Sequence, residues 1–270
     1  DLSRAVGCRI YAEAAHWQPG QRHLKRVVAE MGGKNAIIID ESADLDQAVQ
    51  GVVYSAFGYS GQKCSACSRV IVVAAVYDSF VHRLVEATRS LHVGNPAQPD
   101  TKVGPVIDQA AQSSIKAYIE TGKAEATLAL ALEAPAQGYF VGPTIFTEVA
   151  PTAVIAQEEI FGPVLAVIKA EGFDQALAIA NNTDYGLTGG LYSRTPSHIE
   201  RVKTEFAVGN LYINRGITGA IVSRQPFGGF KMSGVGSKAG GPDYLLQFLE
   251  PRHISENVQR QGFAPIEGVD

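Results

Sequence analysis

The sequence predicts an α/β fold in which a mostly parallel sheet is flanked by helices. Short apolar runs at residues 36–40, 69–74 and 164–168 have the length and composition of buried strands. Amphipathic segments at residues 45–59 and 77–91 lie between them and carry apolar side chains at helical spacing. Strands that alternate with helices in this way are typical of parallel β-α-β units.

The remaining segments continue this alternation. Further helices are expected at residues 8–15, 108–122 and 173–182, and from Pro196, because proline suits the first turn of a helix. Further strands are expected at residues 27–30, 127–132, 145–149, 187–192 and 210–214. Residues 215–239 are rich in glycine and form a long loop, which is typical of functional segments. Residues 244–254 are expected to form a strand, or a helix that turns into a strand.

The composition indicates a globular protein that acts on a small molecule. With 270 residues and 46% hydrophobic side chains, the chain can bury a sizeable core. Its net charge is −4 and its Lys and Arg residues are scattered, so we expect no binding of nucleic acid or of an anionic membrane. The longest apolar run, residues 70–77, is far shorter than the roughly 20 residues that span a bilayer. Three cysteines are too few for a disulfide scaffold and fit a reducing, cytoplasmic compartment.

Residues 58–69 contain the candidate nucleophile, Cys64, among glycines and small polar residues. Gly61 frees the backbone for a sharp turn, and Lys63 is expected to favour the thiolate, the form of cysteine that attacks carbon. Most free cysteines are simply small buried apolar residues. Cys64 and Cys67 also form a C-x-x-C pair, which occurs in redox and metal sites. The rest of the chain favours Cys64 as a nucleophile.

Three features occur in order along the chain. They are Glu30 before Gly32 and Gly33, Cys64 in a glycine-flanked turn, and Glu159 in the run Glu-Glu-Ile-Phe-Gly-Pro. Together they resemble the aldehyde dehydrogenase family, and the resemblance extends over residues 29–35, 61–64, 158–164, 181–188, 209–210 and 226–234. It implies the catalytic-domain fold of that family, with a remnant of a Rossmann-like domain at the start of the chain.

The resemblance implies that Cys64 and Glu30 are the catalytic residues. Cys64 would attack the aldehyde carbon to give a thiohemiacetal, and hydride transfer to NAD, or NADP, would leave a thioester on the enzyme. Glu30 would activate the water that hydrolyses it, and a half-buried carboxylate beside a thiol has the raised pKa that this step needs. The backbone N–H of Cys64 could stabilise the developing oxyanion. Lys34 and Asn35 are expected to close the Gly-Gly turn rather than touch a ligand.

The same resemblance implies a set of cofactor contacts and no metal. Glu159 would accept hydrogen bonds from the nicotinamide ribose, and Phe161 would pack beside the nicotinamide, with a plain core position as the alternative for Phe161. Gly32, in the Gly-Gly turn, is also expected at the cofactor. Ser3 belongs to residues 3–7, which resemble the end of the family's Gly-Ser-x-x-Val-Gly turn at a helix N-terminus.

Within the family, the chain resembles the branch that oxidises L-glutamate γ-semialdehyde to L-glutamate in proline degradation. This resemblance implies that the backbone amides of Gly219 and Ala220 and the hydroxyl of Ser65 bind the α-carboxylate of the substrate. Phe227 would lie against its methylene groups, and Lys63 would line the site. Inward-pointing backbone amides of a glycine-rich loop are suited to binding a carboxylate.

The resemblance also implies a domain organisation. Residues 1–30 would be a remnant of the NAD-binding domain, residues 31–236 the catalytic domain, and residues 237–270 a C-terminal segment with an oligomerisation strand and a polar tail. A homo-oligomer is therefore expected. The chain begins at Asp1 and lacks most of the nucleotide domain and the family's asparagine oxyanion donor, so weak or no dehydrogenase activity is expected.

Other interpretations remain open at this point. The substrate could be a different aldehyde. A thiol-disulfide oxidoreductase built on Cys64 and Cys67 would lose activity when Cys67 is replaced by Ser. A non-catalytic assembly module would use residues 244–254 to extend a partner's sheet. The sequence also leaves open the choice between NAD and NADP, and between a single enzyme and one half of a bifunctional proline oxidase.

Overall fold

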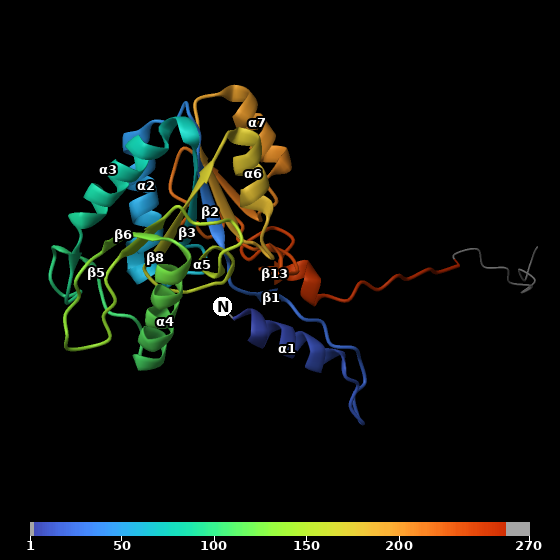
Figure 1. Ribbon diagram of the computed structural model, residues 1–270. Helices are drawn as coiled ribbons and strands as arrows, with labels where there is room; N and C mark the ends of the chain where they lie inside the picture. Colours follow the sequence, from blue (N-terminus) through green and yellow to red (C-terminus); the bar gives the residue numbers. More distant parts are fainter. Residues whose placement is uncertain (1–2, 258–270) are drawn as a thin grey trace, which may run out of the picture.

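A seven-stranded sheet forms the centre of the molecule (Figure 1). The structure is a computed structural model, and it describes residues 3–257. In spatial order the strands are β11 (Asn210–Ile213), β10 (Thr188–Tyr192), β2 (Asn35–Ile39), β3 (Cys67–Val73), β8 (Val164–Ala170), β7 (Thr144–Thr147) and β6 (Thr127–Ala131). Neighbouring strands are parallel, except that β6 and β7 are antiparallel. The predicted α/β fold with a mostly parallel sheet is confirmed.

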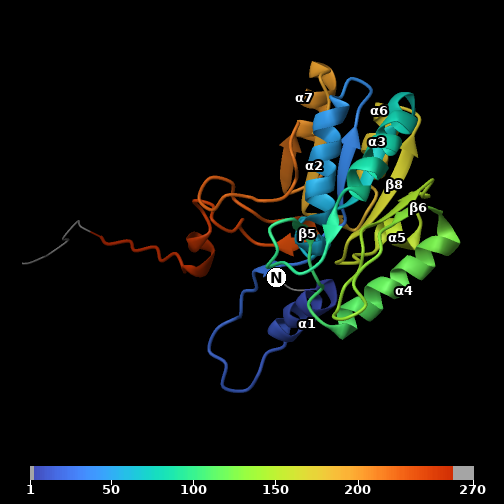
Figure 2. The same ribbon diagram turned by 90° about the vertical axis from the view of Figure 1, so that its left-hand side faces the viewer.

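Helices cover both faces of this sheet (Figures 1 and 2). On one face lie α2 (Leu45–Phe57) and α3 (Tyr77–Arg89), and on the other lie α4 (Gln109–Glu125), α5 (Val154–Gln157), α6 (Phe173–Asn181) and α7 (Pro196–Glu205). In β2, Ile37 and Ile39 belong to the core under α2 and α3, whereas Ala36 and Ile38 belong to the core on the other face. Because both faces are buried, the strand has a continuous apolar sequence instead of an alternating one.

Local hydrogen bonds fix where the predicted helices begin. α2 begins after Asp44, whose side chain accepts a hydrogen bond from the Gln47 N–H at 3.2 Å. α4 begins after Asp108, whose side chain accepts from the Ala111 N–H at 2.8 Å. Such caps satisfy N–H groups that the first turn of a helix leaves unpaired. Pro196 occupies the first turn of α7, as predicted.

Three two-stranded sheets lie outside the main sheet in the described part of the chain. They pair β1 (Ala29–Glu30) with β13 (Gly234–Val235), β9 (Tyr185–Gly186) with β12 (Phe230–Lys231), and β4 (His92–Val93) with β5 (Thr101–Val103). Short 3₁₀ helices are η1 (Gly58–Gly61), η2 (Ala74–Val76) and η3 (Leu245–Phe248). The predicted loop at residues 215–239 therefore contains two strands, which are too short to leave a detectable pattern in the sequence.

The first helix, α1 (Arg4–Ala15), packs against the start of the site region. Gly7 leaves room for Met31, because a Cβ at Gly7 would lie 2.4 Å from the sulfur of Met31. Arg4 forms an ion pair with Asp184 at 2.7 Å. The assignment of residues 1–30 to a nucleotide-binding domain stays a prediction.

The C-terminal segment does not form the predicted strand within this chain. Residues 245–248 form the short helix η3, and residues 249–257 run on without strand or helix. The side chains of Leu245, Leu246, Phe248 and Leu249 are exposed, so they contribute nothing to a core that would fix a strand. The predicted polar tail at residues 255–270 lies mostly outside the described residues.

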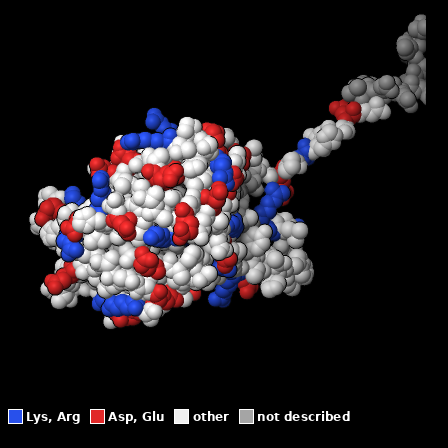
Figure 3. All heavy atoms as spheres, turned by 45° about the horizontal axis from the view of Figure 1, so that its top comes forward, with Lys and Arg blue, Asp and Glu red and all other residues white. Residues whose placement is uncertain are grey.

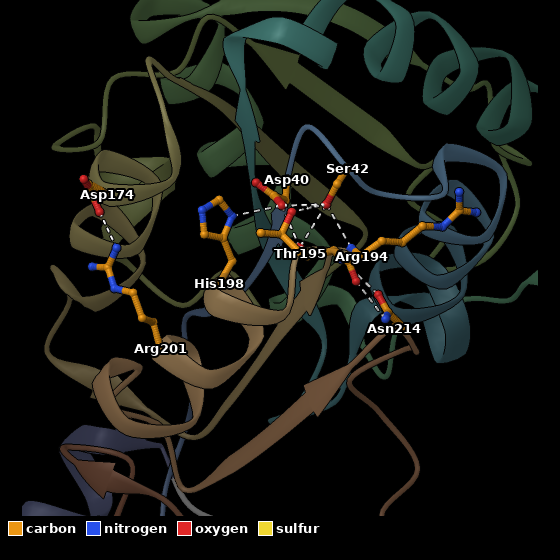
Figure 4. A network of polar contacts seen from close by, with 9 residues as sticks. Asp40, Ser42, Asp174, Arg194, Thr195, His198, Arg201 and Asn214 are labelled. Atoms are coloured by element: carbon orange, nitrogen blue, oxygen red, sulfur yellow. Dashed lines mark hydrogen bonds and ion pairs between the residues drawn. The ribbon is translucent and has the colours of Figure 1, made fainter.

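A buried polar network fastens the carboxyl ends of β2 and β10 (Figure 4). Asp40 Oδ2 accepts hydrogen bonds from Ser193 Oγ at 2.6 Å and Ser42 Oγ at 2.9 Å, and lies 3.1 Å from His198 Nδ1. Asn214 pairs with the backbone N–H and C=O of Ser193 at 2.9 and 3.0 Å. The network thus holds the segments that follow β2 and β10. The candidate site lies at the opposite end of the sheet, at the amino ends of the parallel strands.

Charged side chains are mixed on the surface. On the face in Figure 3, basic and acidic residues are interspersed and neither sign gathers into a patch. Among residues 3–257, no helix combines the length and hydropathy required for crossing a membrane.

Replacing Asp40 with Asn should lower the free energy of unfolding by about 1–3 kcal/mol, because Ser193, Ser42 and His198 would then share one neutral amide oxygen in place of a charged carboxylate. Burial raises the pKa of Asp40, but hydrogen bonds from Ser193, His198 and Ser42 outweigh it and leave that pKa below its usual value. The stabilisation is therefore present above the ordinary Asp pKa of about 4 and is lost as pH falls through the lower, folded-state value.

Urea unfolding measures this difference. Asp174→Asn is the matched control, because Asp174 is an exposed carboxylate paired with Arg201 (Figure 4), and it should leave the midpoint unchanged. Equal midpoints for Asp40→Asn and the parent chain would contradict a stabilising role for the network.

Candidate active site

The candidate nucleophile lies in a turn between α2 and β3 whose backbone is strained. Tyr59, Ser60 and Gly61 have φ values of 57°, 57° and 68°, in the left-handed region that favours glycine. Gly61 also has no room for a side chain, since a Cβ there would lie 2.3 Å from the carbonyl oxygen of Gly162. Strain of this kind persists only where surrounding contacts fix the backbone. Cys64 follows directly after this turn.

Hydrogen bonds from neighbouring segments hold the turn. Ser60 Oγ donates to the Gly104 carbonyl at 2.8 Å, and Gln62 Oε1 accepts from the Ile107 N–H at 2.9 Å. These two contacts join the turn to the segment before α4, and both depend on side chains that the sequence left unassigned.

Asn35 fixes the other side of the turn. Its side-chain amide donates to the carbonyl oxygens of Cys64 at 2.7 Å and Ala66 at 2.8 Å, and its Oδ1 accepts from the Thr188 N–H at 2.9 Å. The buried side chain thereby joins the amino ends of β2, β3 and β10. Asn35 was predicted to close the Gly-Gly turn, but its side-chain hydrogen bonds go to Cys64, Ala66 and Thr188 instead.

The Gly-Gly turn makes room for Glu159. A Cβ at Gly32 would lie 1.8 Å from Glu159 Oε2, so any side chain at this position would displace the carboxylate. The Gly33 N–H donates to Glu159 Oε1 at 3.0 Å. Burial raises the pKa of Glu159, and the Gly33 hydrogen bond and the charge of Lys34 oppose the rise. Within residues 3–257, Glu159 Oε2 accepts no hydrogen bond and is free to bind a ligand hydroxyl.

Glu30 lies in β1, opposite Gly234 of β13, and is half-buried. Burial raises the pKa of Glu30 to about 7, against the opposing charge of Lys238. A carboxyl group with this pKa is partly ionised at neutral pH and can take a proton from water. The raised pKa predicted for Glu30 is confirmed.

The charges of two carboxylates disfavour the ionised form of the Cys64 thiol. Burial raises the pKa of Cys64, and the charges of Glu30 and Glu159 raise it further, while the Ser65 N–H lowers it. Both carboxylates therefore lie near enough to the thiol for their charges to raise its pKa. The expected stabilisation of the thiolate by Lys63 is wrong, because the Lys63 ammonium lies over the ring of Tyr59, 5.9 Å from its centroid.

Cys67 is unsuited to a redox pair with Cys64. It is the first residue of β3, is 2% exposed, and its thiol donates to the Arg69 carbonyl at 3.3 Å. Burial raises the pKa of Cys67 to about 12, so the thiolate needed for disulfide exchange is scarce. All three cysteines, including the exposed Cys8, are free.

One cleft opens at Glu159 and another beside the nucleophile turn. The first, of about 740 Å³, lies between the start of α1 and the Glu159 segment and is lined by Ser3, Arg4, Ala5, Cys8, Tyr118, Gln157, Glu158, Glu159, Asp184 and Tyr185. Ser3 caps α1 by accepting a hydrogen bond from the Val6 N–H at 3.4 Å. The second cleft, of about 680 Å³, is lined in part by Tyr59 and Phe161. Phe161 is 43% exposed, which is inconsistent with a plain core position.

The structure gives less support to the residues that were predicted to bind the substrate. Ser65 is buried next to Cys64, whereas Gly219 is exposed, has a φ of 79° and has open space where a Cβ would lie. Phe227 pairs with Ala239 through two backbone hydrogen bonds of 2.9 and 2.8 Å. In the described residues no hydrogen bond joins Gly219 or Ala220 to Ser65, so the carboxylate site stays a prediction.

Two buried cations, Arg69 and Lys34, lie behind the site. Arg69 donates to the carbonyl oxygens of Lys34, Ile179 and Ala180 at 3.1, 3.3 and 3.0 Å and so fixes the end of α6 against the Gly-Gly turn. Burial lowers the pKa of Lys34 to about 7, and its Nζ has no hydrogen-bond partner in the described chain. From the sequence, Lys34 was given a structural role in the Gly-Gly turn but Arg69 was given no role, because a single cation at the start of an apolar strand has no periodic signal.

Replacing Glu30 or Glu159 with Gln should speed alkylation of Cys64 by iodoacetamide about three- to tenfold near pH 8, because removing a negative charge favours the thiolate. The rate is measured in a Cys8→Ser background, so that Cys64 is the only reactive thiol. Glu171→Gln, an exposed carboxylate beyond the far end of β8, is the control and should leave the rate unchanged. An unchanged or slower rate in both site variants would show that the two carboxylates do not act on the thiol.

Comparison with known proteins agrees with this geometry. The model of the aldehyde dehydrogenase family matches residues 3–254. A protein of Bacillus subtilis (strain 168) named 1-pyrroline-5-carboxylate dehydrogenase is 57% identical over 255 residues, which cover 94% of this chain and 50% of that protein. One of the same name from Geobacillus thermodenitrificans is 58% identical over the same shares. The chain thus spans about half the length of these relatives.

Solved structures give the same result. Proline utilization A from Bdellovibrio bacteriovorus, solved after inactivation by N-propargylglycine, has a TM-score of 0.94 and 57% identity over 98% of this chain and 28% of that protein. A Thermus 1-pyrroline-5-carboxylate dehydrogenase with bound NAD has a TM-score of 0.90 and 52% identity over 92% of this chain and 48% of that protein. With a cysteine turn faced by two carboxylates and a family match over nearly all of its length, the chain belongs to the aldehyde dehydrogenase family.

Proposed function

We propose that this protein oxidises L-glutamate γ-semialdehyde, which forms from 1-pyrroline-5-carboxylate, to L-glutamate with NAD as the cofactor. The proposal is supported by the charges of Glu30 and Glu159 that act on the Cys64 thiol, and by burial that raises the pKa of Glu30 to about 7. The choice of substrate is supported by relatives at 57% and 58% identity that are named 1-pyrroline-5-carboxylate dehydrogenases.

In the proposed reaction, the sulfur of Cys64 adds to the aldehyde carbon. The new C–S bond moves an electron pair onto the carbonyl oxygen, and the backbone N–H of Cys64 can stabilise the resulting oxyanion. No acceptor for this N–H lies within residues 3–257, so the donor is available. Because burial and the two carboxylates disfavour the thiolate, the thiol must give up its proton as the sulfur attacks, and we propose the ionised Glu30 carboxylate as the acceptor. Glu30 then returns this proton to solvent before it acts on water.

The residues around the larger cleft fit NAD. Glu159 has a free oxygen for the ribose hydroxyls, and Gly32 leaves the space that this carboxylate needs. The N–H groups at the start of α1, next to Ser3, suit the diphosphate, and Phe161 would lie beside the nicotinamide. When bound, NAD supplies the acceptor for the hydride that leaves the substrate carbon, and a thioester on Cys64 remains.

Glu30 completes the proposed cycle by hydrolysing the thioester. Its carboxylate takes a proton from water, the water oxygen bonds to the acyl carbon, and the C–S bond breaks to release L-glutamate and the Cys64 thiolate. Since Glu30 must be ionised for this step, the rate of hydrolysis should rise with pH through about 7. Ser65, Gly219, Ala220, Phe227 and Lys63 are proposed to hold the amino-acid end of the substrate.

The location and assembly of the protein are part of the same proposal. Three free thiols fit a reducing compartment, which supports a cytoplasmic location. Exposed apolar side chains at residues 245–249 support a homo-oligomer in which this segment contacts a second copy. Light scattering after deletion of residues 244–254 tests the assembly, and an unchanged mass would contradict it.

The activity is tested by NADH formation from L-glutamate γ-semialdehyde, measured on the longest natural polypeptide that contains this chain. We expect faster turnover than with butanal, which has no α-amino-acid group to bind. Cys64→Ser should abolish turnover, and Glu30→Gln should lower kcat about 10²- to 10⁴-fold.

Cys67→Ser is the matched control for the nucleophile. It should leave turnover nearly unchanged, because the Cys67 side chain is buried in β3. Loss of activity in Cys67→Ser as well as in Cys64→Ser would instead support a redox role for the pair. Equal rates with butanal and L-glutamate γ-semialdehyde would overturn the proposed substrate but not the proposed reaction.

A further inference from the structure

Lys238 is a cation near Glu30 that has no role in the proposed reaction. Lys238 is partly buried, and its Nζ donates to the carbonyl oxygens of Gly228 at 2.6 Å and Gly209 at 2.8 Å. It also lies over the ring of Phe230, 4.9 Å from the centroid. Among residues 3–257, no carboxylate forms an ion pair with it. The ammonium is thus fixed by neutral groups and keeps one of its three donors free.

The carbonyl acceptors belong to the backbone that packs against Glu30. A Cβ at Gly228 would lie 2.7 Å from Glu30 Oε1 and 3.3 Å from Lys238 Cγ, so the backbone of Gly228 lies between the two side chains. A Cβ at Gly209 would lie 1.8 Å from the Gly228 carbonyl oxygen and 2.6 Å from Lys238 Nζ. Both positions require glycine if carboxylate, backbone and ammonium are to approach one another this closely.

Backbone hydrogen bonds join the two ends of the 227–239 loop, which carries Lys238, and the loop also pairs with Glu30. Phe227 and Ala239 exchange backbone hydrogen bonds at its base, and Gly234 pairs with Glu30. Lys238 therefore comes from a segment whose two ends are fixed, and its charge has a defined position beside the carboxylate.

The electrostatic coupling between the two groups is mutual. Burial raises the pKa of Glu30 and the charge of Lys238 lowers it, while burial lowers the pKa of Lys238 and the charge of Glu30 raises it. The other titratable groups nearby are Cys64, which faces Glu30, and Asp243, which lines an open cleft together with Lys238. Lys34, the buried cation behind the site, acts on Glu159 and is not among the charges that shift Glu30.

We propose that Lys238 is a positioning residue for Glu30, whose fixed ammonium holds the 227–239 loop against the carboxylate and keeps a positive charge beside it. The inference rests on the proposed function, because it matters only if Glu30 acts as the general base. A charge in this place keeps a larger fraction of Glu30 ionised at neutral pH, and the ionised form is the one that activates water.

Hydrolysis of p-nitrophenyl acetate by the 270-residue chain in a Cys8→Ser background isolates this step without a cofactor. The Cys64 thiolate attacks the acetyl carbon and releases p-nitrophenolate as a burst. Water then attacks the thioester, its proton passes to Glu30, and acetate leaves as the thiolate re-forms. The burst therefore reports on Cys64, and the steady rate that follows reports on Glu30.

Lys238→Met should keep the full burst and move the midpoint of the steady rate to higher pH. A rise of about one pH unit from a midpoint near 7 lowers the ionised fraction at neutral pH about fivefold, and the steady rate should fall to the same extent. Near pH 9 the rates of Lys238→Met and the parent should agree within about twofold, because Glu30 is then ionised in both. Lys238→Arg, which keeps the charge, should restore most of the rate at neutral pH.

Other results would overturn the inference. Equal slowing of Lys238→Met at every pH, with a full burst, would show that Lys238 only supports the fold of the loop. An unchanged pH profile would show that its charge does not act on Glu30. A burst that survives Cys64→Ser, or a steady rate that survives Glu30→Gln, would overturn the proposed function and this inference with it. The two kinds of failure are therefore distinguishable.

Discussion

The hydrogen bonds of the Asn35 side chain are the constraint on which the site depends. The nucleophile turn contains three consecutive residues with left-handed backbone, two of which are not glycine, and such a backbone costs of order 1–3 kcal/mol per strained residue. Asn35 offsets this cost by fixing the carbonyl oxygens of Cys64 and Ala66 from the amino end of β2. Since its Oδ1 also binds the start of β10, three parallel strands jointly determine where the thiol lies.

Burial affects the two residues that we propose as catalytic, Glu30 and Cys64, in opposite ways. It raises the pKa of Glu30 to about 7, which suits a base that must take a proton from water and later release it. It also raises the pKa of Cys64, and the two carboxylates add to that rise. A thiol is oxidised and alkylated less readily than a thiolate, so this rise protects Cys64 from side reactions. In our proposal, Lys238 acts on the same site by keeping Glu30 ionised.

The sequence was sufficient to predict the fold and to single out the candidate site residues. Buried strands and amphipathic helices alternate clearly, and Glu30, Cys64 and Glu159 stand in conspicuous glycine-rich contexts. The direction of side chains was not predictable, as Lys63 shows: it adjoins Cys64 in sequence but lies over Tyr59. Lys238 is far from Glu30 along the chain, and only the pairing of two-residue strands brings them together. The strand expected at residues 244–254 failed because an apolar run forms a strand only where a partner covers it.

The central claim is that Cys64 carries the substrate as a thioester that Glu30 helps to hydrolyse. Mass spectrometry of the longest natural form of the protein, quenched with acid during turnover of L-glutamate γ-semialdehyde and NAD, tests it most directly. The account predicts a glutamyl group on the peptide that contains Cys64, with greater occupancy in Glu30→Gln than in the parent. A protein that turns over the substrate with no acyl group on Cys64 in either form would contradict the account.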